Sequence, residues 1–284
     1  MLKTKVSESA LMALTTNIFS ILFAIYTWIA GKKYKRFSVS CKTNEIIISG
    51  KTQIEKLNIK YDGYITRQKI QVEQFKKLEG VVPSRFIRGN HDTPLTYIKN
   101  FPYSEYKDEI EGSYDGTMRS TYQFITLGGQ KYMLLVLDSF ADAFLLNWAN
   151  DVVEDNPDCK VIVATHAYLD RDGTLFESSE AKEATGDIIW DRFAKKHKNI
   201  VLILSGHVAS DRVITRYTKG DNGNTVTQML INPQMTDHSV KGGGFVAMLY
   251  FKKGSDEVQV EYYSTAYDKY YFGENQYTIN IDMY

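Results

Sequence analysis

Two segments of the chain, residues 160–166 (KVIVATH) and 199–207 (NIVLILSGH), are apolar and β-branched until their last few positions. Strands of this composition are buried on both faces, as in parallel sheets that helices cover. Residues 142–155 and 188–198 have the apolar periodicity of such covering helices. The sequence therefore predicts a layered α/β (α+β) domain with its helices outside the sheets.

Most of the remaining chain predicts further strands. Residues 119–138 form a candidate hairpin around Gly128-Gly129, and residues 65–79 predict an amphipathic helix. Shorter apolar or alternating runs predict strands over 46–48, 57–61, 84–88, 212–218, 225–232, 245–251 and 257–265. Ligands in such sheets collect at the carboxyl ends of strands, so those ends are the first places to search for a site.

The composition excludes several classes of protein. Hydrophobic residues make up 43% of the 284 residues and charged residues 24%, which is typical of globular domains and not of disordered chains. Two cysteines cannot form a disulfide framework. Lys and Arg balance Asp and Glu at 34 each, so the charge gives no indication of a nucleic-acid partner.

Residues 9–31 carry no charge, and a cluster of Lys and Arg residues follows them over 32–36. We expect an apolar helix here, within an N-terminal segment (1–40) that precedes the main domain (41–284). The stretch is long enough to cross a bilayer and attach the protein to a membrane. The alternative is a helix that packs on the sheet. No small-residue cleavage site follows, so the compartment stays open between cytoplasmic, exported and membrane-associated.

Three polar clusters follow three predicted strands. They are Asn90-His91-Asp92 after 84–88, His166 after 160–164, and His207 after 199–205. Each cluster alone is compatible with an ordinary turn. Together they place three of the five histidines at one edge of a sheet. Imidazole nitrogen and amide oxygen are ligands for Mn, Fe or Zn, so the sequence indicates a metal site at this edge.

The motifs GNHD (89–92), TH (165–166) and SGHV (205–208) resemble those of the calcineurin-like metallophosphoesterases, in the family's order. The resemblance covers about residues 66–284. Within it, LNWANDVVEDNPDCKVIVATHAYLDRDGT and GDNGNTVTQMLINPQ are similar to a bacterial subgroup of large, often exported members.

The resemblance implies a four-layer αββα sandwich that hydrolyses phosphomonoesters or phosphodiesters with two divalent ions, Mn, Fe or Zn. It implies that Asn90, His166 and His207 bind one of these ions. His91 would protonate the leaving group or contact the phosphate, and Asp92 would orient His91.

The N-terminal part departs from the family pattern. An Asp-x-His or Asp-x-Gln motif and a Gly-Asp motif, which supply the other metal ligands, are absent before Gly89. The nearest equivalent of the second is Gly50-Lys51, which puts a cation where the bridging carboxylate belongs. Asp62, the only aspartate before Gly89, either replaces that carboxylate or forms a turn with Gly63. One bound ion, or none, is therefore the alternative to two.

Two functions remain open at this point. The first is an active phosphoesterase, with a metal site that the missing motifs impair. The second is a catalytically inactive binding or scaffold protein on the same fold. Three side chains are assigned other roles: Asp138 a structural one or one that supports the metal ligands, His197 an interaction with the end of a helix, and His238 a place in a polar loop near the site.

Overall fold

The computed structural model describes the backbone of five N-terminal strands and the full structure of most of the chain from Ser84 onward. The described ranges are 9–17, 20–26, 37–42, 45–50, 57–60, 84–139, 141–178, 185–232, 245–265, 267–271 and 273–281. The helix predicted over 65–79, and Lys51, Asp62 and His238, lie outside them.

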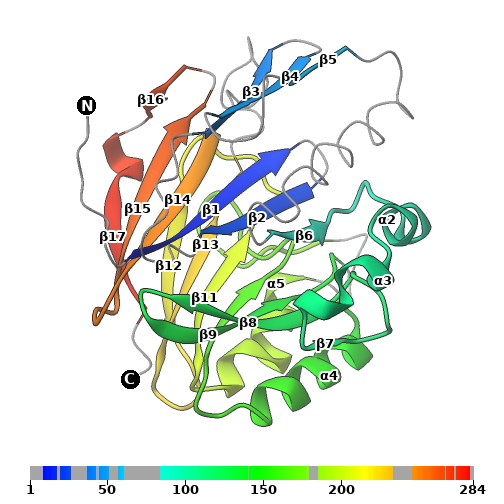
Figure 1. Ribbon diagram of the computed structural model, residues 1–284. Coiled ribbons are helices and arrows are strands. Elements are labelled where there is room, and N and C mark those ends of the chain that lie inside the picture. Colours follow the sequence, from blue (N-terminus) through cyan, green and yellow to red (C-terminus); the bar gives the residue numbers. More distant parts are fainter. Residues whose placement is uncertain are drawn as a thin grey trace.

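Two large sheets form the centre of the molecule (Figure 1). The first has the order β16-β15-β14-β1-β2-β6, with β17 paired to β15. Its strands are β1 (Ser9–Asn17), β2 (Ser20–Tyr26), β6 (Ser84–Arg88), β14 (Phe245–Lys252), β15 (Glu257–Ser264), β16 (Lys269–Tyr270) and β17 (Tyr277–Asn280).

The second sheet has the order β12-β13-β11-β10-β9-β8-β7. Its strands are β7 (Gly112–Ser113), β8 (Thr121–Leu127), β9 (Gln130–Val136), β10 (Lys160–Ala164), β11 (Ile200–Ser205), β12 (Ile214–Lys219) and β13 (Thr225–Leu230). A small third sheet contains β3 (Phe37–Lys42), β4 (Glu45–Gly50) and β5 (Leu57–Lys60).

Three apolar clusters define the layers. One lies between the two large sheets and includes Ile87, Ile162, Leu204 and Leu249. A second packs α4 (Ala143–Glu154) and α5 (Gly186–Arg192) on the outer face of the second sheet. A third packs α2 (Pro94–Asn100) and α3 (Tyr103–Tyr106) beside β6. This helix–sheet–sheet–helix order confirms the predicted sandwich.

The helix predicted over residues 9–31 is wrong, because β1 and β2 occupy this stretch. A continuous apolar run has no periodicity that separates a buried strand from a buried helix. Here β1 pairs with both β14 and β2, and β2 pairs with both β1 and β6. Strands paired on both sides lie inside a sheet, which explains a run without charges. Of the helices that the structure describes, none is long and apolar enough to cross a membrane.

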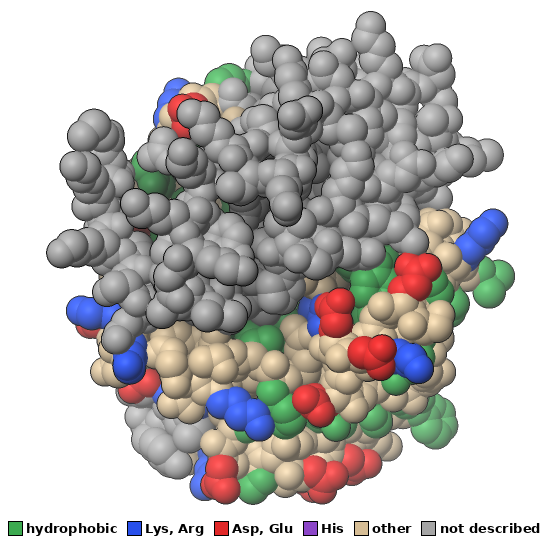
Figure 2. Space-filling model, in the orientation of Figure 1, with side chains coloured by type: hydrophobic (Ala, Val, Ile, Leu, Met, Phe, Trp, Pro, Cys, Tyr) green, Lys and Arg blue, Asp and Glu red, His purple; other side chains and the backbone are tan. Residues whose placement is uncertain are grey.

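The other predicted elements are close to their observed bounds. The hairpin is β8 and β9, and the helix over 142–155 is α4. The helix predicted over 188–198 is shorter, because α5 ends at Arg192 and a 3-10 turn follows over 194–196. On the face in Figure 2, acidic and basic side chains of the described residues are interspersed.

Candidate metal site

The strands that carry the three polar clusters end at one edge of the sandwich. In the second sheet, β9, β10, β11 and β13 run parallel. Their pairing continues past the strand ends, where the Thr165 amide donates to the Leu204 carbonyl at 3.0 Å and the Gly206 amide donates to the His166 carbonyl at 2.9 Å. His166 and His207 therefore stand on neighbouring strand ends with a fixed backbone separation.

Asn90 comes from the other sheet, in a tight turn after β6. The Asp92 amide donates to the Gly89 carbonyl at 3.1 Å, and the Gly89 amide donates to Asp92 Oδ2 at 3.0 Å. These reciprocal bonds fix the turn that follows Arg88.

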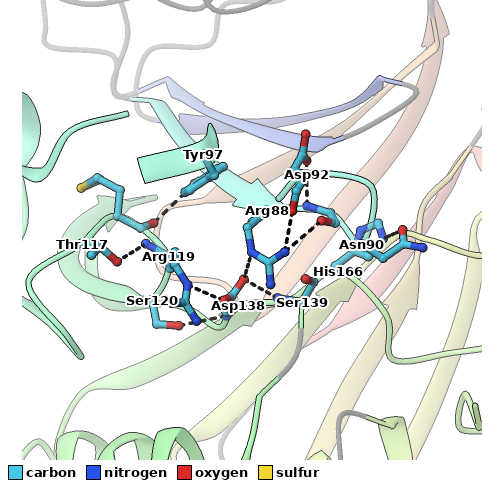
Figure 3. A network of polar contacts seen from close by, with 12 residues as sticks. Arg88, Asn90, Asp92, Tyr97, Thr117, Arg119, Ser120, Asp138, Ser139 and His166 are labelled. Carbon is cyan, nitrogen blue, oxygen red and sulfur yellow. Dashed lines mark hydrogen bonds and ion pairs between the residues drawn. The ribbon is translucent and has the colours of Figure 1, made fainter. Parts of the chain in front are cut away.

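The three predicted ligands converge on one point (Figure 3 shows Asn90 and His166). His166 Nε2 lies 2.9 Å from Asn90 Oδ1 and 3.0 Å from His207 Nδ1. Zn²⁺ in proteins is usually tetrahedral, so two ligand atoms at about 2.1 Å from it would be about 3.4 Å apart. The separations of 2.9 and 3.0 Å are shorter and are those of hydrogen bonds, so the three side chains would move apart by about 0.5 Å to hold an ion.

The hydrogen bonding of His166 also fits a cation. Its Nε2 carries either one proton or one lone pair, so it cannot make two full hydrogen bonds to Asn90 and His207. Its Nδ1 is buried and has no hydrogen-bond partner in the structure. A cation would accept electron density from all three converging atoms. The residues present therefore fit a divalent ion that prefers nitrogen and amide oxygen.

Burial keeps the two imidazoles neutral. It lowers the pKa of His166 to about 3, with nearby His207 as the next cause, and it also lowers the pKa of His207. Only a neutral imidazole has a lone pair for a metal. The fold therefore prepares both rings for binding across the neutral pH range.

His207 is held in a strained backbone conformation. Its φ is 65°, and the Val208 amide donates to the Gly206 carbonyl at 2.8 Å, which closes a γ-turn around it. The left-handed region costs an ordinary residue about 1–2 kcal/mol. Asn232, two residues after β13 ends, offsets part of this cost: its Nδ2 donates to the His207 carbonyl at 2.8 Å. The ring of Phe176 packs edge-on against the imidazole.

Sequence reasoning missed Asn232, although it lies two residues beyond the end of a strand, as His166 does in the same sheet. It also missed Arg88, a buried residue at the end of β6, directly before the turn that contains Asn90. Arg88 Nε pairs with Asp138 Oδ1 at 2.6 Å, and Arg119 Nε pairs with Asp138 Oδ2 at 2.7 Å. Asp138 is thus a buried carboxylate that pairs with two arginines.

His91 is exposed and Asp92 is half-buried beside the converging ligands. Burial raises the pKa of Asp92 to about 6, against the opposing effect of its bond from the Gly89 amide. That bond gives the carboxylate a role in the turn itself. The orientation of His91 by Asp92, and proton transfer by His91, stay predictions.

His197 is separate from this cluster. Its Nε2 lies 2.7 Å from Asn150 Oδ1, and burial lowers its pKa. His197 follows the 3-10 turn over 194–196 as its C-terminal cap residue, so its interaction with a helix end stays a prediction. The hydrogen bond to Asn150 and the lowered pKa favour the neutral ring.

The strand register shows what β1 brings to the same edge. Asn17 pairs with Ser20, and Ser20 pairs with Arg88, so the carboxyl end of β1 lies near the Asn90 turn. That end reads Thr15-Thr16-Asn17 and contains no carboxylate. Among the described residues, no group of three His, Cys, Asp or Glu side chains could hold a metal. The described part of the candidate site, called the half-site below, consists of the imidazoles of His166 and His207 and the amide of Asn90.

We expect His166→Ala to weaken Zn²⁺ binding by more than the roughly 10–100-fold that changes outside the ligand shell cause. The measurement is a Zn²⁺ titration against a chromophoric chelator. His197→Ala, which also removes a buried imidazole, is the matched control and should keep the wild-type affinity. Equal losses in both variants would contradict the assignment.

The positive φ at His207 predicts that glycine is more stabilising than alanine at this position, the reverse of the usual order. His207→Gly should be more stable than His207→Ala by about 0.5–1 kcal/mol, because glycine adopts positive φ freely and its greater freedom in the unfolded chain cancels only part of that gain. Urea unfolding measures both. At Ala209, which lacks a positive φ, Ala209→Gly should lose stability instead. A less stable His207→Gly would show that the turn is not strained.

The buried His166 also predicts a pH dependence of stability. Between the folded pKa of about 3 and the ordinary value of 6.5, the unfolded chain binds a proton that the folded chain does not. This group therefore destabilises the fold as pH falls. Asp92, raised from 3.8 to about 6, acts with the opposite sign between those values.

A comparison of variants isolates the His166 contribution. With chelator present, we expect the free energy of unfolding of the wild type, minus that of His166→Ala, to shrink as pH falls from about 7 to about 4. Urea unfolding over this range provides the measurement. A difference that does not change with pH would mean that His166 titrates normally.

Comparison with known proteins agrees with this geometry. The family model described as calcineurin-like phosphoesterase matches residues 61–211, more than half of the chain. Uncharacterized protein YvnB of Bacillus subtilis (strain 168) is 26% identical over 290 residues, covering 91% of this chain and 22% of that protein. A tRNA uridine 5-carboxymethylaminomethyl modification enzyme MnmG, from Lachnoclostridium phytofermentans, is 76% identical over 29 residues, or 10% of this chain and 4% of that protein.

The chain thus spans less than a quarter of the length of the curated relatives it matches. The family match includes GNHD, TH and SGHV, the segments that carry the three converging ligands. The chain belongs to the calcineurin-like phosphoesterase family.

Proposed function

We propose that this protein hydrolyses phosphomonoesters or phosphodiesters with a divalent metal ion held by Asn90, His166 and His207. The observation that carries the proposal is the convergence of Asn90 Oδ1 and His207 Nδ1 on His166 Nε2, at 2.9 and 3.0 Å. These atoms come from different sheets and from strand ends far apart in the sequence. A purely structural role would not require three ligand atoms at one point.

The chain's own residues divide into holding and proton-transfer roles. A bound Mn, Fe or Zn ion would supply Lewis-acid activation of water and neutralisation of phosphate charge. Asn90, His166 and His207 hold it, and burial maintains the neutral form of both imidazoles. His91 is exposed next to Asn90, where it can give a proton to the leaving oxygen of a substrate.

The second candidate is a binding or scaffold protein with the same fold and no catalysis. One observation favours it: among the described residues, no carboxylate hydrogen-bonds to the three ligands, and the adjacent end of β1 contains none. Three neutral ligands hold a hard divalent ion less firmly than a set that includes carboxylates. Asp62 is the candidate in the sequence for restoring a bridging carboxylate.

Metal content and turnover together separate the two candidates. For the phosphoesterase, we expect the purified wild type to bind Mn²⁺ or Zn²⁺ and to hydrolyse bis-p-nitrophenyl phosphate or p-nitrophenyl phosphate. His91→Ala should keep the metal, counted by mass spectrometry, and lose turnover by about 10²–10⁴-fold, the range for a general acid. His207→Ala should lose both metal and turnover.

Three other results would change the proposed function or the proposed site. Metal bound without turnover in the wild type supports the scaffold. Equal turnover in the wild type and His91→Ala removes the acid role. About two ions per chain, falling to one in Asp62→Asn, would show that Asp62 completes a two-metal site.

A further inference from the structure

The ligands of the half-site come from two different sheets. Asn90 follows β6 of the first sheet, whereas His166 and His207 follow β10 and β11 of the second. Apolar packing between sheets is non-directional and does not by itself fix such a separation. A metal site needs its ligands within about 0.5 Å of their working positions. A directional interaction, such as a hydrogen bond or an ion pair, must therefore join the two sheet edges here.

The Arg88–Asp138 ion pair joins the two edges. Arg88 is the last residue of β6, and Asp138 lies two residues beyond the end of β9, in the other sheet. Arg88 Nε and Asp138 Oδ1 are 2.6 Å apart, and the two side chains are 3% and 1% exposed. Charged pairs this deeply buried are geometrically demanding, because each partner lacks water as an alternative.

Both ends of the pair are fixed to the backbone. Arg88 Nη1 donates to the Asp92 carbonyl at 2.7 Å, so the guanidinium spans the turn that contains Asn90 (Figure 3). On the other side, Asp138 Oδ1 accepts from the Ser139 amide, and Ser120 Oγ accepts from the Asp138 amide. A shift of one sheet edge would break several of these bonds at once.

A second buried arginine on the same strand provides a contrast. Arg85 is as buried as Arg88 and is also paired, with its Nη1 3.0 Å from Glu109 Oε2. Its partner belongs to the 3-10 turn after α3, in the helical layer that packs beside β6, and not to the second sheet. Arg85 therefore contributes a buried charge and an ion pair without touching the Asn90 turn.

We propose that the Arg88–Asp138 pair is a positioning device that sets the separation between Asn90 and the two histidines. It acts through the backbone of the Gly89–Asp92 turn and touches neither metal nor substrate. The metal part of this inference rests on the proposed function, whereas the ordering of the turn does not.

The test compares Arg88→Met with Arg85→Met, each of which removes one buried guanidinium. We expect Zn²⁺ affinity to fall at least tenfold in Arg88→Met and to change less than about twofold in Arg85→Met, because an outer partner of a metal site is worth about 10–100-fold. The absorption spectrum of bound Co²⁺ should change only in Arg88→Met. Arg88→Lys, which keeps the charge but lacks the planar fork, should give an intermediate loss.

A metal-free measurement makes the test independent of the proposed function. Amide hydrogen exchange at Gly89 and Asp92 should be at least tenfold faster in Arg88→Met than in Arg85→Met. The exchange rate of the Val208 amide should be the same in both variants. If Arg88→Met does not fold, Asp138→Glu shifts the pair by one methylene and should produce the same pattern.

The possible outcomes are distinct. Unchanged exchange at the turn, or equal effects of Arg88→Met and Arg85→Met, overturns the positioning role. Faster exchange in Arg88→Met, with no Zn²⁺ binding even in the wild type, supports the positioning role of the Arg88–Asp138 pair and overturns the proposed function instead.

Discussion

The apolar layer between the two large sheets is the constraint on which the site depends. Ile87 from β6 packs in the same cluster as Ile162 from β10 and Leu204 from β11. These residues lie only a few positions before Asn90, His166 and His207. Burial of the strand interiors therefore brings the polar residues that follow them to one edge. The ends of these three apolar strands thus decide at which edge the site lies.

At that edge, several local features lower the stability of the folded protein. His166 is buried in a way that opposes its protonated form, His207 occupies a left-handed conformation, and Arg88 and Asp138 are charges removed from water. Two of these features have specific partners: the Asn232 amide donates to the His207 carbonyl, and Arg88 and Asp138 pair with each other. Strain and buried polar groups concentrated at one place are typical of functional sites, where geometry is maintained at the expense of stability.

The side chains that converge at this edge limit which ion the proposed site would take. Two neutral imidazoles and one amide oxygen would favour Zn²⁺ or a similar ion over the hard ions that carboxylates select. The absence of a carboxylate at the end of β1 follows from its sequence, because the strand register brings Thr15-Thr16-Asn17 to that edge. Membership of the calcineurin-like phosphoesterase family thus establishes the framework, while metal binding and turnover depend on how this edge is completed.

The sequence by itself determined the elements whose pattern is local. The continuous strands β10 and β11, the hairpin of β8 and β9, and α4 follow from periodicity and turn residues. Strand-end polarity indicated that Asn90, His166 and His207 would lie together, and they do. Tertiary structure decided the rest. β1 and β2 became strands because neighbours on both sides supply hydrogen bonds, which an apolar run does not reveal. Arg88 and Asn232 gained their roles from partners 50 and 25 residues away, since a long-range hydrogen bond has no local sequence pattern.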